Sequence, residues 1–205
     1  DIELAKYTSS RLHITGVSTA ASVALIRAAK QEGVAISCSV TPYHLFFTDE
    51  DLTGYDTNLK VNPPLRTKAD RDALREAVLE GHIDCITSHH LPEDPDHKQV
   101  EFEYAAFGMS GLETSFAIAR TALPGLSLDA LVDLFSRNAR KLFPLPDSSI
   151  RKDAPASLTL FHPDSEWQPR SLQSRSKNTP FTGRTLTGRP AGIINKDTLF
   201  LNQLV

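Results

Sequence analysis

The sequence lacks most of the features that mark specialised classes of protein. Only 2 of its 205 residues are cysteine, so it has no disulfide framework of the kind that holds small secreted domains together. Both cysteines, Cys38 and Cys85, lie in apolar runs, where a free thiol behaves as a small hydrophobic side chain. No apolar run approaches the roughly 20 residues that span a bilayer, and the first residues, DIELAKYTSS, have neither the basic nor the apolar region of a signal peptide. We therefore expect a cytoplasmic protein with no membrane partner.

The sequence also has no excess of basic charge. Its formal net charge is −3 and its pI is about 6.2, so we expect no nucleic-acid partner. Zinc-finger spacing, a phosphate-binding glycine loop and a G-x-S-x-G elbow are all absent. With 40% hydrophobic and 23% charged residues, the chain has the composition of a globular protein with one sizeable core or two small ones.

Strand-like and helix-like segments alternate in the first half of the sequence. Strands are predicted over residues 11–18, 34–40 and 82–87, and amphipathic helices over 19–33 and 68–81, the second with Leu74, Val78 and Leu79 facing inward. This alternation predicts an α/β fold with a parallel sheet and helices packed outside it. In such sheets the chemistry lies where strands end, which here means the loops after Val17, over 41–66 and over 88–111.

The second half of the sequence changes character. Helices are predicted over 111–122 and 127–142, and Ser136 could cap a separate last helix. From Pro144 onward a linker (145–155) leads to short β-like runs, which indicate a small β-rich appendage. These runs cover residues 156–161, 183–188, 191–195 and 197–201. The missing initiator methionine predicts that the sequence is a piece of a longer chain.

Three stretches contain candidate functional residues. In NLKVNPPLR two prolines stiffen a loop, which either presents Asn62 and Arg66 to a carboxylate or amide ligand or is a rigid connector. In FGMSGLET the backbone near Gly108 and Gly111 either approaches a ligand or forms a turn before a helix. In CITSHHLPEDPDHK, His89 and His90 follow a strand, and alternation along an extended segment predicts that one of the two faces a given cavity.

Taken in order, six segments resemble dihydroorotase, the cyclic amidohydrolase of pyrimidine biosynthesis that interconverts carbamoyl aspartate and dihydroorotate. These segments are VSTAASVALIRAAK, VTPYHLFFTDEDL, NLKVNPPLR, GHIDCITSHHLPEDPDHK, FEYAAFGMSGLET and NTPFTGRTLTGRP. The resemblance implies that residues 1–143 are the carboxyl-terminal half of a metal-dependent (β/α)8 barrel of the TIM type. It implies that residues 144–205 are a linker and part of a small β-rich domain.

The resemblance also implies metal-assisted hydrolysis, in which zinc activates a water molecule and an aspartate moves a proton. The family's His-x-His ligand pair would lie before Asp1. Where the family has H-V-S-T with a ligand histidine, this chain has GVST, so Gly16 marks a lost ligand. Where the family has T-D-H-A-P-H, this chain has SHHLPE, so His89 takes the position of the catalytic aspartate and Glu93 that of a substrate-binding histidine.

Other positions match the family. Asn62, Phe107 and Gly108 match its substrate-contact positions, whereas a carboxylate at Glu93 would repel an anionic substrate. Imidazole binds zinc in many proteins, so His89 is a candidate metal ligand as well as the candidate catalytic residue.

These comparisons lead to one leading hypothesis and two alternatives. The leading hypothesis is a dihydroorotase-like chain with an incomplete zinc site, inactive by itself, that scaffolds aspartate carbamoyltransferase or self-associates through unpaired strand edges. The first alternative is an active zinc-dependent dihydroorotase with His89 in place of the usual aspartate, acting on dihydroorotate and carbamoyl aspartate. The second is an amidohydrolase for a different cyclic amide that Glu93 selects.

Overall fold

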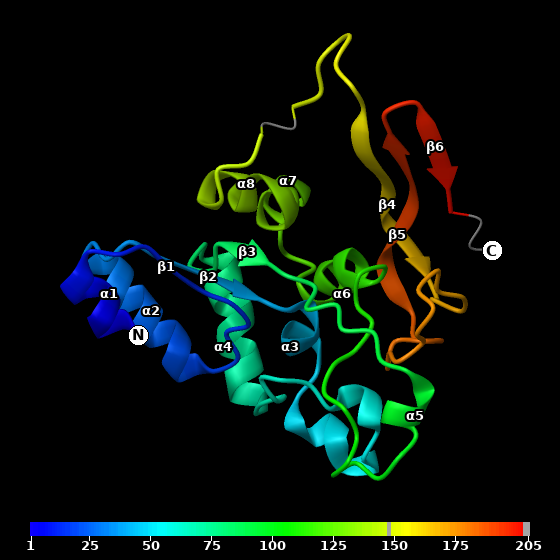
Figure 1. Ribbon diagram of the computed structural model, residues 1–205, viewed down its shortest axis with the longest axis horizontal. Coiled ribbons are helices and arrows are strands. Elements are labelled where there is room, and N and C mark those ends of the chain that lie inside the picture. Colours follow the sequence, from blue (N-terminus) through cyan, green and yellow to red (C-terminus); the bar gives the residue numbers. More distant parts are fainter. Residues whose placement is uncertain (147–148, 203–205) are drawn as a thin grey trace.

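The computed structural model describes residues 1–146 and 149–202 (Figure 1). Two residues of the predicted linker, 147 and 148, and the last three residues of the chain lie outside the described residues. The predicted strand at the start is preceded by a helix that the sequence pattern did not indicate, α1 (Ile2–Thr8). Among the described residues no helix has the length and apolar character needed to cross a membrane.

Three short parallel strands form the first sheet. Their order is β1 (Leu12–Ile14), β2 (Ile36–Val40) and β3 (Cys85–Ile86), with β2 paired to both neighbours. The strands alternate with helices α2 (Ala20–Gln31) and α4 (Lys68–Leu79), which contact each other. The predicted α/β class is therefore confirmed. Both outer strands are shorter than predicted, because the chain leaves the sheet on either side of them into turns and loops.

Local sequence explains where the two long helices begin and which faces they bury. Thr19 and Thr67 cap α2 and α4, each hydroxyl accepting a hydrogen bond from the backbone N–H three residues later. Leu74 and Val78 are buried as predicted. The prediction for Leu79 is wrong, since its side chain is 52% exposed. Leu79 follows Val78 by about 100° around the helix and so leaves the buried stripe.

The segment between β2 and α4 is made of short turns. α3 (Pro42–Phe46) follows β2 directly, and two 3₁₀ turns cover Asp49–Gly54 and Thr57–Leu59. After β3 come α5 (Pro95–Lys98) and α6 (Ser115–Ala122), which are separated by the irregular segment 99–114. α6 begins four residues later than predicted.

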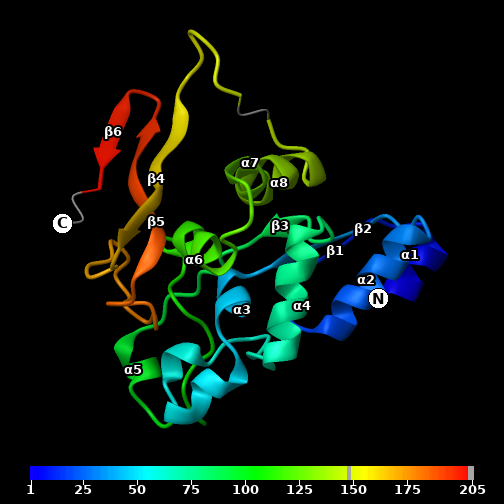
Figure 2. The same cartoon turned by 180° about the vertical axis from the view of Figure 1, so that it is seen from behind.

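The predicted second helix of this half is continuous rather than split at Ser136. It begins at the Ser127 cap and comprises α7 (Leu128–Val132), a π-helical turn (Asp133–Arg137) and α8 (Asn138–Leu142). Ser136 therefore lies inside the π turn and caps nothing. α7 and α8 lie on the side of β3 away from α4, as the front and back views agree (Figures 1 and 2).

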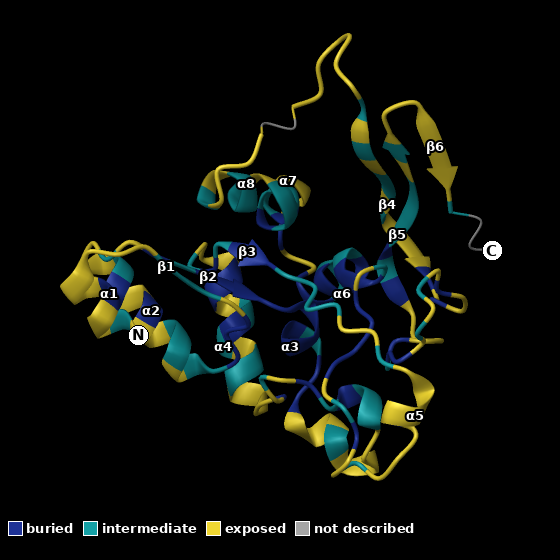
Figure 3. Ribbon diagram, viewed as in Figure 1, coloured by how far each residue is buried: buried dark blue, intermediate teal, exposed yellow. Residues whose placement is uncertain are grey.

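The β-rich region is an antiparallel sheet of β4 (Ser157–Trp167), β5 (Leu186–Asn195) and β6 (Thr198–Leu201). Two runs predicted as separate strands, 183–188 and 191–195, join in β5, because a register shift accommodates Pro190 opposite Phe161. β5 packs against α6, while β6 lies on the outer edge with all four residues exposed (Figure 3).

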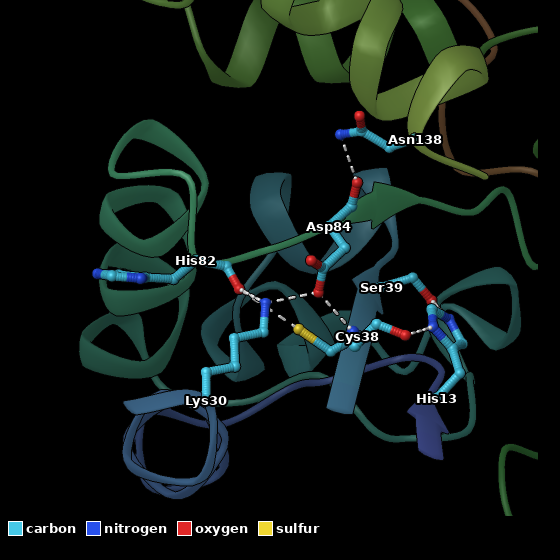
Figure 4. A network of polar contacts seen from close by, with 8 residues as sticks. His13, Lys30, Cys38, Ser39, His82, Asp84 and Asn138 are labelled. Carbon is cyan, nitrogen blue, oxygen red and sulfur yellow. Dashed lines mark hydrogen bonds and ion pairs between the residues drawn. The ribbon is translucent and has the colours of Figure 1, made fainter. Parts of the chain in front are cut away.

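A polar network ties the helices to the first sheet (Figure 4). Lys30 Nζ lies 2.6 Å from Asp84 Oδ2, which also accepts a hydrogen bond from the Cys38 backbone N–H at 2.8 Å. The side-chain amide of Asn138 donates to the Asp84 carbonyl oxygen. One residue thus joins α2, β2 and α8 just before β3. This network lies away from the carboxyl ends of the strands, so its role is in stability.

Candidate functional site

A cavity of about 210 Å³ opens where β2 and β3 end. It is lined by Tyr43, Asn62, His89, His90, Leu91, Phe107 and Gly108. Five residues singled out from the sequence line it, namely Asn62, His89, His90, Phe107 and Gly108. The loops predicted to hold chemistry after the second and third strands therefore meet at one place.

His89 lines the cavity and has an uncommon backbone conformation. Its backbone has a φ of 39°, in the left-handed region, which non-glycine residues adopt infrequently and mostly where surrounding structure requires it. The expectation that one of His89 and His90 would face a given cavity is wrong, because both line it. Alternation of side chains holds for extended backbone, and the left-handed turn at His89 interrupts it.

Both ring nitrogens of His89 have a partner within the chain. Nε2 lies 3.0 Å from the Thr15 hydroxyl, and Nδ1 lies 3.4 Å from the hydroxyl of Tyr43. Burial lowers the pKa of His89 below its usual range, so the ring is neutral near pH 7. Burial also raises the pKa of Tyr43 to about 12, so the phenol keeps its proton. His89 is thus a neutral imidazole held between two hydroxyl groups.

The hydrogen bonds continue from His89 into the sheet. The Ser39 hydroxyl donates to Thr15 at 3.2 Å and lies 3.3 Å from His13 Nε2, and the other ring nitrogen of His13 lies 2.8 Å from the Ser37 hydroxyl. His13, isolated in the sequence, is therefore a hydrogen-bonded histidine in the sheet. It reaches His89 only through two hydroxyl groups.

Gly16 faces the ring of His89. A Cβ atom built at Gly16 would lie 2.7 Å from Cε1 of His89, closer than real Cβ atoms approach other atoms. The φ of Gly16 is +69°, a conformation that glycine adopts without strain. A side chain at position 16 is thus disfavoured both by the backbone and by the ring that already occupies the space.

His90 and the glycines of FGMSGLET have mainly structural partners. His90 Nδ1 accepts from the N–H groups of Gly111 and Leu112, at 3.3 and 3.4 Å. The Gly108 N–H donates to the Lys60 carbonyl oxygen at 2.8 Å. Because these backbone donors are satisfied within the protein, the Gly108 and Gly111 N–H groups are not free to bind a ligand.

Glu93 and Arg66 lie outside the cavity. Glu93 lines a separate cavity, and its carboxylate accepts from Nδ1 of His97 at 3.1 Å. Arg66 is exposed and does not line the His89 cavity. Of the two polar residues that flank the prolines of NLKVNPPLR, Asn62 therefore belongs to the candidate site and Arg66 does not.

His44 supports the cavity from behind. Its Nε2 donates to the Pro63 carbonyl oxygen at 3.0 Å, and its Nδ1 lies 2.7 Å from the Thr41 hydroxyl. Burial lowers the pKa of His44 to about 4, which keeps the ring neutral. His44 thereby anchors the loop that carries Asn62, a role that its isolated position in the sequence did not indicate.

A zinc site needs three or four nitrogen, oxygen or sulfur ligands. In residues 1–146 and 149–202, no three His, Cys, Asp or Glu side chains are grouped as a metal site would require. Gly16 offers no donor, and both nitrogens of His89 are engaged by hydroxyl groups. These residues do not fit a complete zinc site, and any ligands beyond His89 would have to come from outside the described part of the chain.

Three further residues shape the site and were not singled out from the sequence. Tyr43 and Leu91 line the cavity, and Thr15 holds His89. Leu91 lies so close to Gly108 that a Cβ there would be 2.5 Å from its Cδ2 atom. Thr15 and Tyr43 stand at or just after the ends of strands, so strand-end position was the signal available for them.

Comparison with known proteins gives consistent sequence matches. No profile of a known protein family matches the chain. The chain is 42% identical to the dihydroorotase of Syntrophus aciditrophicus over 193 residues, covering 92% of this chain and 45% of that protein. It is 45% identical to the dihydroorotase of Carboxydothermus hydrogenoformans over 196 residues, covering 93% and 46%. The chain spans about half the length of these curated relatives.

Solved structures agree with the sequence matches. An L-hydantoinase (dihydropyrimidinase) from Arthrobacter aurescens superposes with a TM-score of 0.88 at 28% identity, covering 98% of this chain and 47% of that one. An inactive dihydroorotase-like domain of a Chaetomium thermophilum CAD-like multifunctional protein superposes with a TM-score of 0.73 at 23% identity, covering 97% and 53%. Over nearly all of its length, the chain is therefore homologous to about half of a dihydroorotase and shares the fold of the cyclic amidohydrolases.

Proposed function

We propose that the chain is the carboxyl-terminal half of a dihydroorotase-family protein of pyrimidine biosynthesis whose metal site has degenerated. In this proposal residues 1–143 are half of a (β/α)8 barrel and residues 144–205 are a linker and part of the small β domain. The protein is cytoplasmic, and its role is structural. It scaffolds a partner enzyme, for which aspartate carbamoyltransferase is the candidate, or it associates with itself.

The observation that carries the proposal is the contact between Gly16 and His89. At the two positions where the family places a ligand histidine and a catalytic aspartate, this chain has a glycine without a donor and a neutral imidazole packed against it. The imidazole fills the space that a side chain at position 16 would need. A neutral imidazole also cannot replace an aspartate as a negatively charged ligand, although it can accept a proton.

The proposal is tested by the zinc content of the natural protein that carries these residues. We expect substoichiometric zinc after purification without chelators, and no change on His89→Ala. Stoichiometric zinc that is lost in His89→Ala would contradict a degenerate site. His82→Ala is the matched control, because His82 is another partly exposed histidine whose Nε2 contacts Glu80 away from the cavity.

One observation favours the alternative of an active zinc enzyme. Because the His89 ring is neutral and lines the cavity, its lone pair is available to a metal if a hydroxyl partner rotates away. In that case His89 would bind zinc together with a His-x-His pair from outside this chain, and Asn62 and Phe107 would contact dihydroorotate. Gly108 would only line the site, because its N–H already donates to the Lys60 carbonyl oxygen. Glu93, which lines a different cavity, would not select the substrate.

A further inference from the structure

A second cavity, of about 200 Å³, is lined in part by Lys98 and Asn178, which both donate to the Gly108 carbonyl oxygen. Three segments that are distant in sequence form it: residues 57–58, residues 93–99 and the irregular stretch 175–178 between β4 and β5. Its volume is below the roughly 300–1,000 Å³ of pockets for drug-sized ligands. The cavity therefore suits a small molecule of a few heavy atoms.

The charge of this cavity differs from that of the chain. Lys98, Arg175 and Lys177 line it together with one carboxylate, Glu93. The lining thus has a formal excess of two positive charges, on a chain with a net charge of −3. The Glu93 carboxylate already has a partner in the chain, since Nδ1 of His97 lies 3.1 Å from its Oε2.

The cationic side chains of this cavity differ in how many of their N–H donors already have a partner in the protein. The Arg175 guanidinium is exposed and has no hydrogen-bond or ion-pair partner among the described residues, so all five of its N–H donors are available. Lys98 is only 5% exposed, and its Nζ donates to the carbonyl oxygens of Ala106 and Gly108 at 2.8 and 3.0 Å. Two carbonyl bonds leave one ammonium N–H of Lys98 unused.

The rest of the wall is held rigidly. Lys177 Nζ donates to the carbonyl oxygens of Leu172 and Ser174, which folds its side chain back along its own loop. The side-chain amide of Asn178 bonds to the Leu91 and Gly108 carbonyl oxygens and to the Glu93 N–H. A buried lysine and a fixed amide thus form the floor, and a free guanidinium stands at the rim.

We propose that this cavity binds a small dianion, the chemistry shared by a phosphate group and a short dicarboxylate. Arg175 offers the planar, forked donors that match two oxygens of such a group, while Lys98 supplies a poorly hydrated positive charge beneath it. Binding would offset the free-energy cost of keeping the Lys98 ammonium buried, where burial already lowers the pKa of this group.

The ligand would also act on the His89 cavity. The Gly108 carbonyl oxygen accepts from both Lys98 and Asn178, and Gly108 lines the cavity that contains His89. A dianion that accepts a hydrogen bond from the Lys98 ammonium would change the hydrogen bond that this ammonium donates to the Gly108 carbonyl oxygen. Binding in one cavity is therefore detectable at the wall of the other.

The test is a titration of the ¹⁵N-labelled protein, in separate arms, with inorganic phosphate and with succinate at constant ionic strength set by chloride. We expect saturable shifts of the amide resonances of Gly108 and Asn178 with at least one dianion, at a dissociation constant of about 1 mM or below. Arg175→Ala should weaken binding by about tenfold or more, because it removes a charge-assisted pair of hydrogen bonds. Shifts with phosphate alone indicate a phosphoryl ligand, and shifts with succinate alone indicate a dicarboxylate.

Arg170→Ala is the matched control, because Arg170 lies in the same irregular stretch, donates to Gln168 at 3.2 Å and does not line the cavity. It removes the same charge and should change the dissociation constant by less than about twofold. No saturable shift with either dianion, or equal weakening by the two variants, would overturn the proposal. Neither result depends on zinc or on turnover at His89.

Discussion

The contact between Gly16 and His89 makes a quantitative prediction for Gly16→Ala. The new methyl group would meet Cε1 of His89 at 2.7 Å, at a residue whose φ is +69°. The left-handed backbone costs an alanine about 1–2 kcal/mol, and overpacking against a ring that cannot move freely costs about 1–3 kcal/mol more. We therefore expect a loss of about 2–5 kcal/mol in the free energy of unfolding.

A double-mutant cycle separates the two contributions. In a His89→Ala background the ring is absent, so Gly16→Ala should cost only the backbone contribution of about 1–2 kcal/mol. Gly33→Ala is the matched control, because Gly33 has a φ of +80° and a Cβ added there would meet no atom within 4 Å. It reports the backbone contribution, and the change in unfolded-chain entropy, without a clash.

The assay is urea unfolding of the five proteins at one fixed protein concentration, since association would make apparent stability depend on concentration. We expect a coupling of about 1–3 kcal/mol between positions 16 and 89. Additive effects within about 0.5 kcal/mol would refute the claim that the His89 ring occupies the space of a side chain at position 16.

His44 has a pKa of about 4 when folded, against 6.5 for an unperturbed histidine, so the unfolded state binds more protons between these values. This residue should therefore lower stability by up to about 1.4 kcal/mol per pH unit as pH drops from 6.5 to 4. The urea midpoints of His44→Gln should fall less steeply, with a residual slope from His13 and His89, whose pKa values burial also lowers. Asp84→Ala should cost about 2–3 kcal/mol, because it leaves the Cys38 N–H without an acceptor and leaves the Lys30 ammonium with the His82 carbonyl oxygen alone. Asp164→Ala removes an exposed carboxylate 2.9 Å from Arg120 and should cost under about 1 kcal/mol. Equal losses in thermal or urea unfolding would contradict this. The isolated chain should self-associate in sedimentation velocity through its unpaired strand edges, and a strictly monomeric sample with cooperative unfolding would contradict that.

The sequence was sufficient to predict the elements whose signals are local. Apolar periodicity located α2 and α4, and alternation of strands and helices gave the parallel sheet. The same reasoning placed Asn62, His89, Phe107 and Gly108 in strand-end loops, and the structure brings these four together. Periodicity gave the wrong prediction for Leu79. A residue at the edge of a helix's apolar stripe can be buried or exposed, and the pattern does not say which.

Other features depend on contacts between distant segments. His90 bonds to backbone groups more than twenty residues later, and Thr15 reaches His89 across the sheet. The left-handed backbone at His89 turned both histidines toward one cavity, which a strict alternation rule excludes. The join of two short runs in β5 depends on a register shift at Pro190, a property of strand pairing rather than of either run alone.

The most direct test of the central claim is turnover by the natural protein that contains these residues. Hydrolysis of dihydroorotate and cyclisation of carbamoyl aspartate would be measured with added zinc, for the protein and for its His89→Ala variant. We expect no turnover above the uncatalysed rate for either protein. Robust turnover that disappears in His89→Ala would contradict a degenerate site and would establish His89 as part of a working metal centre.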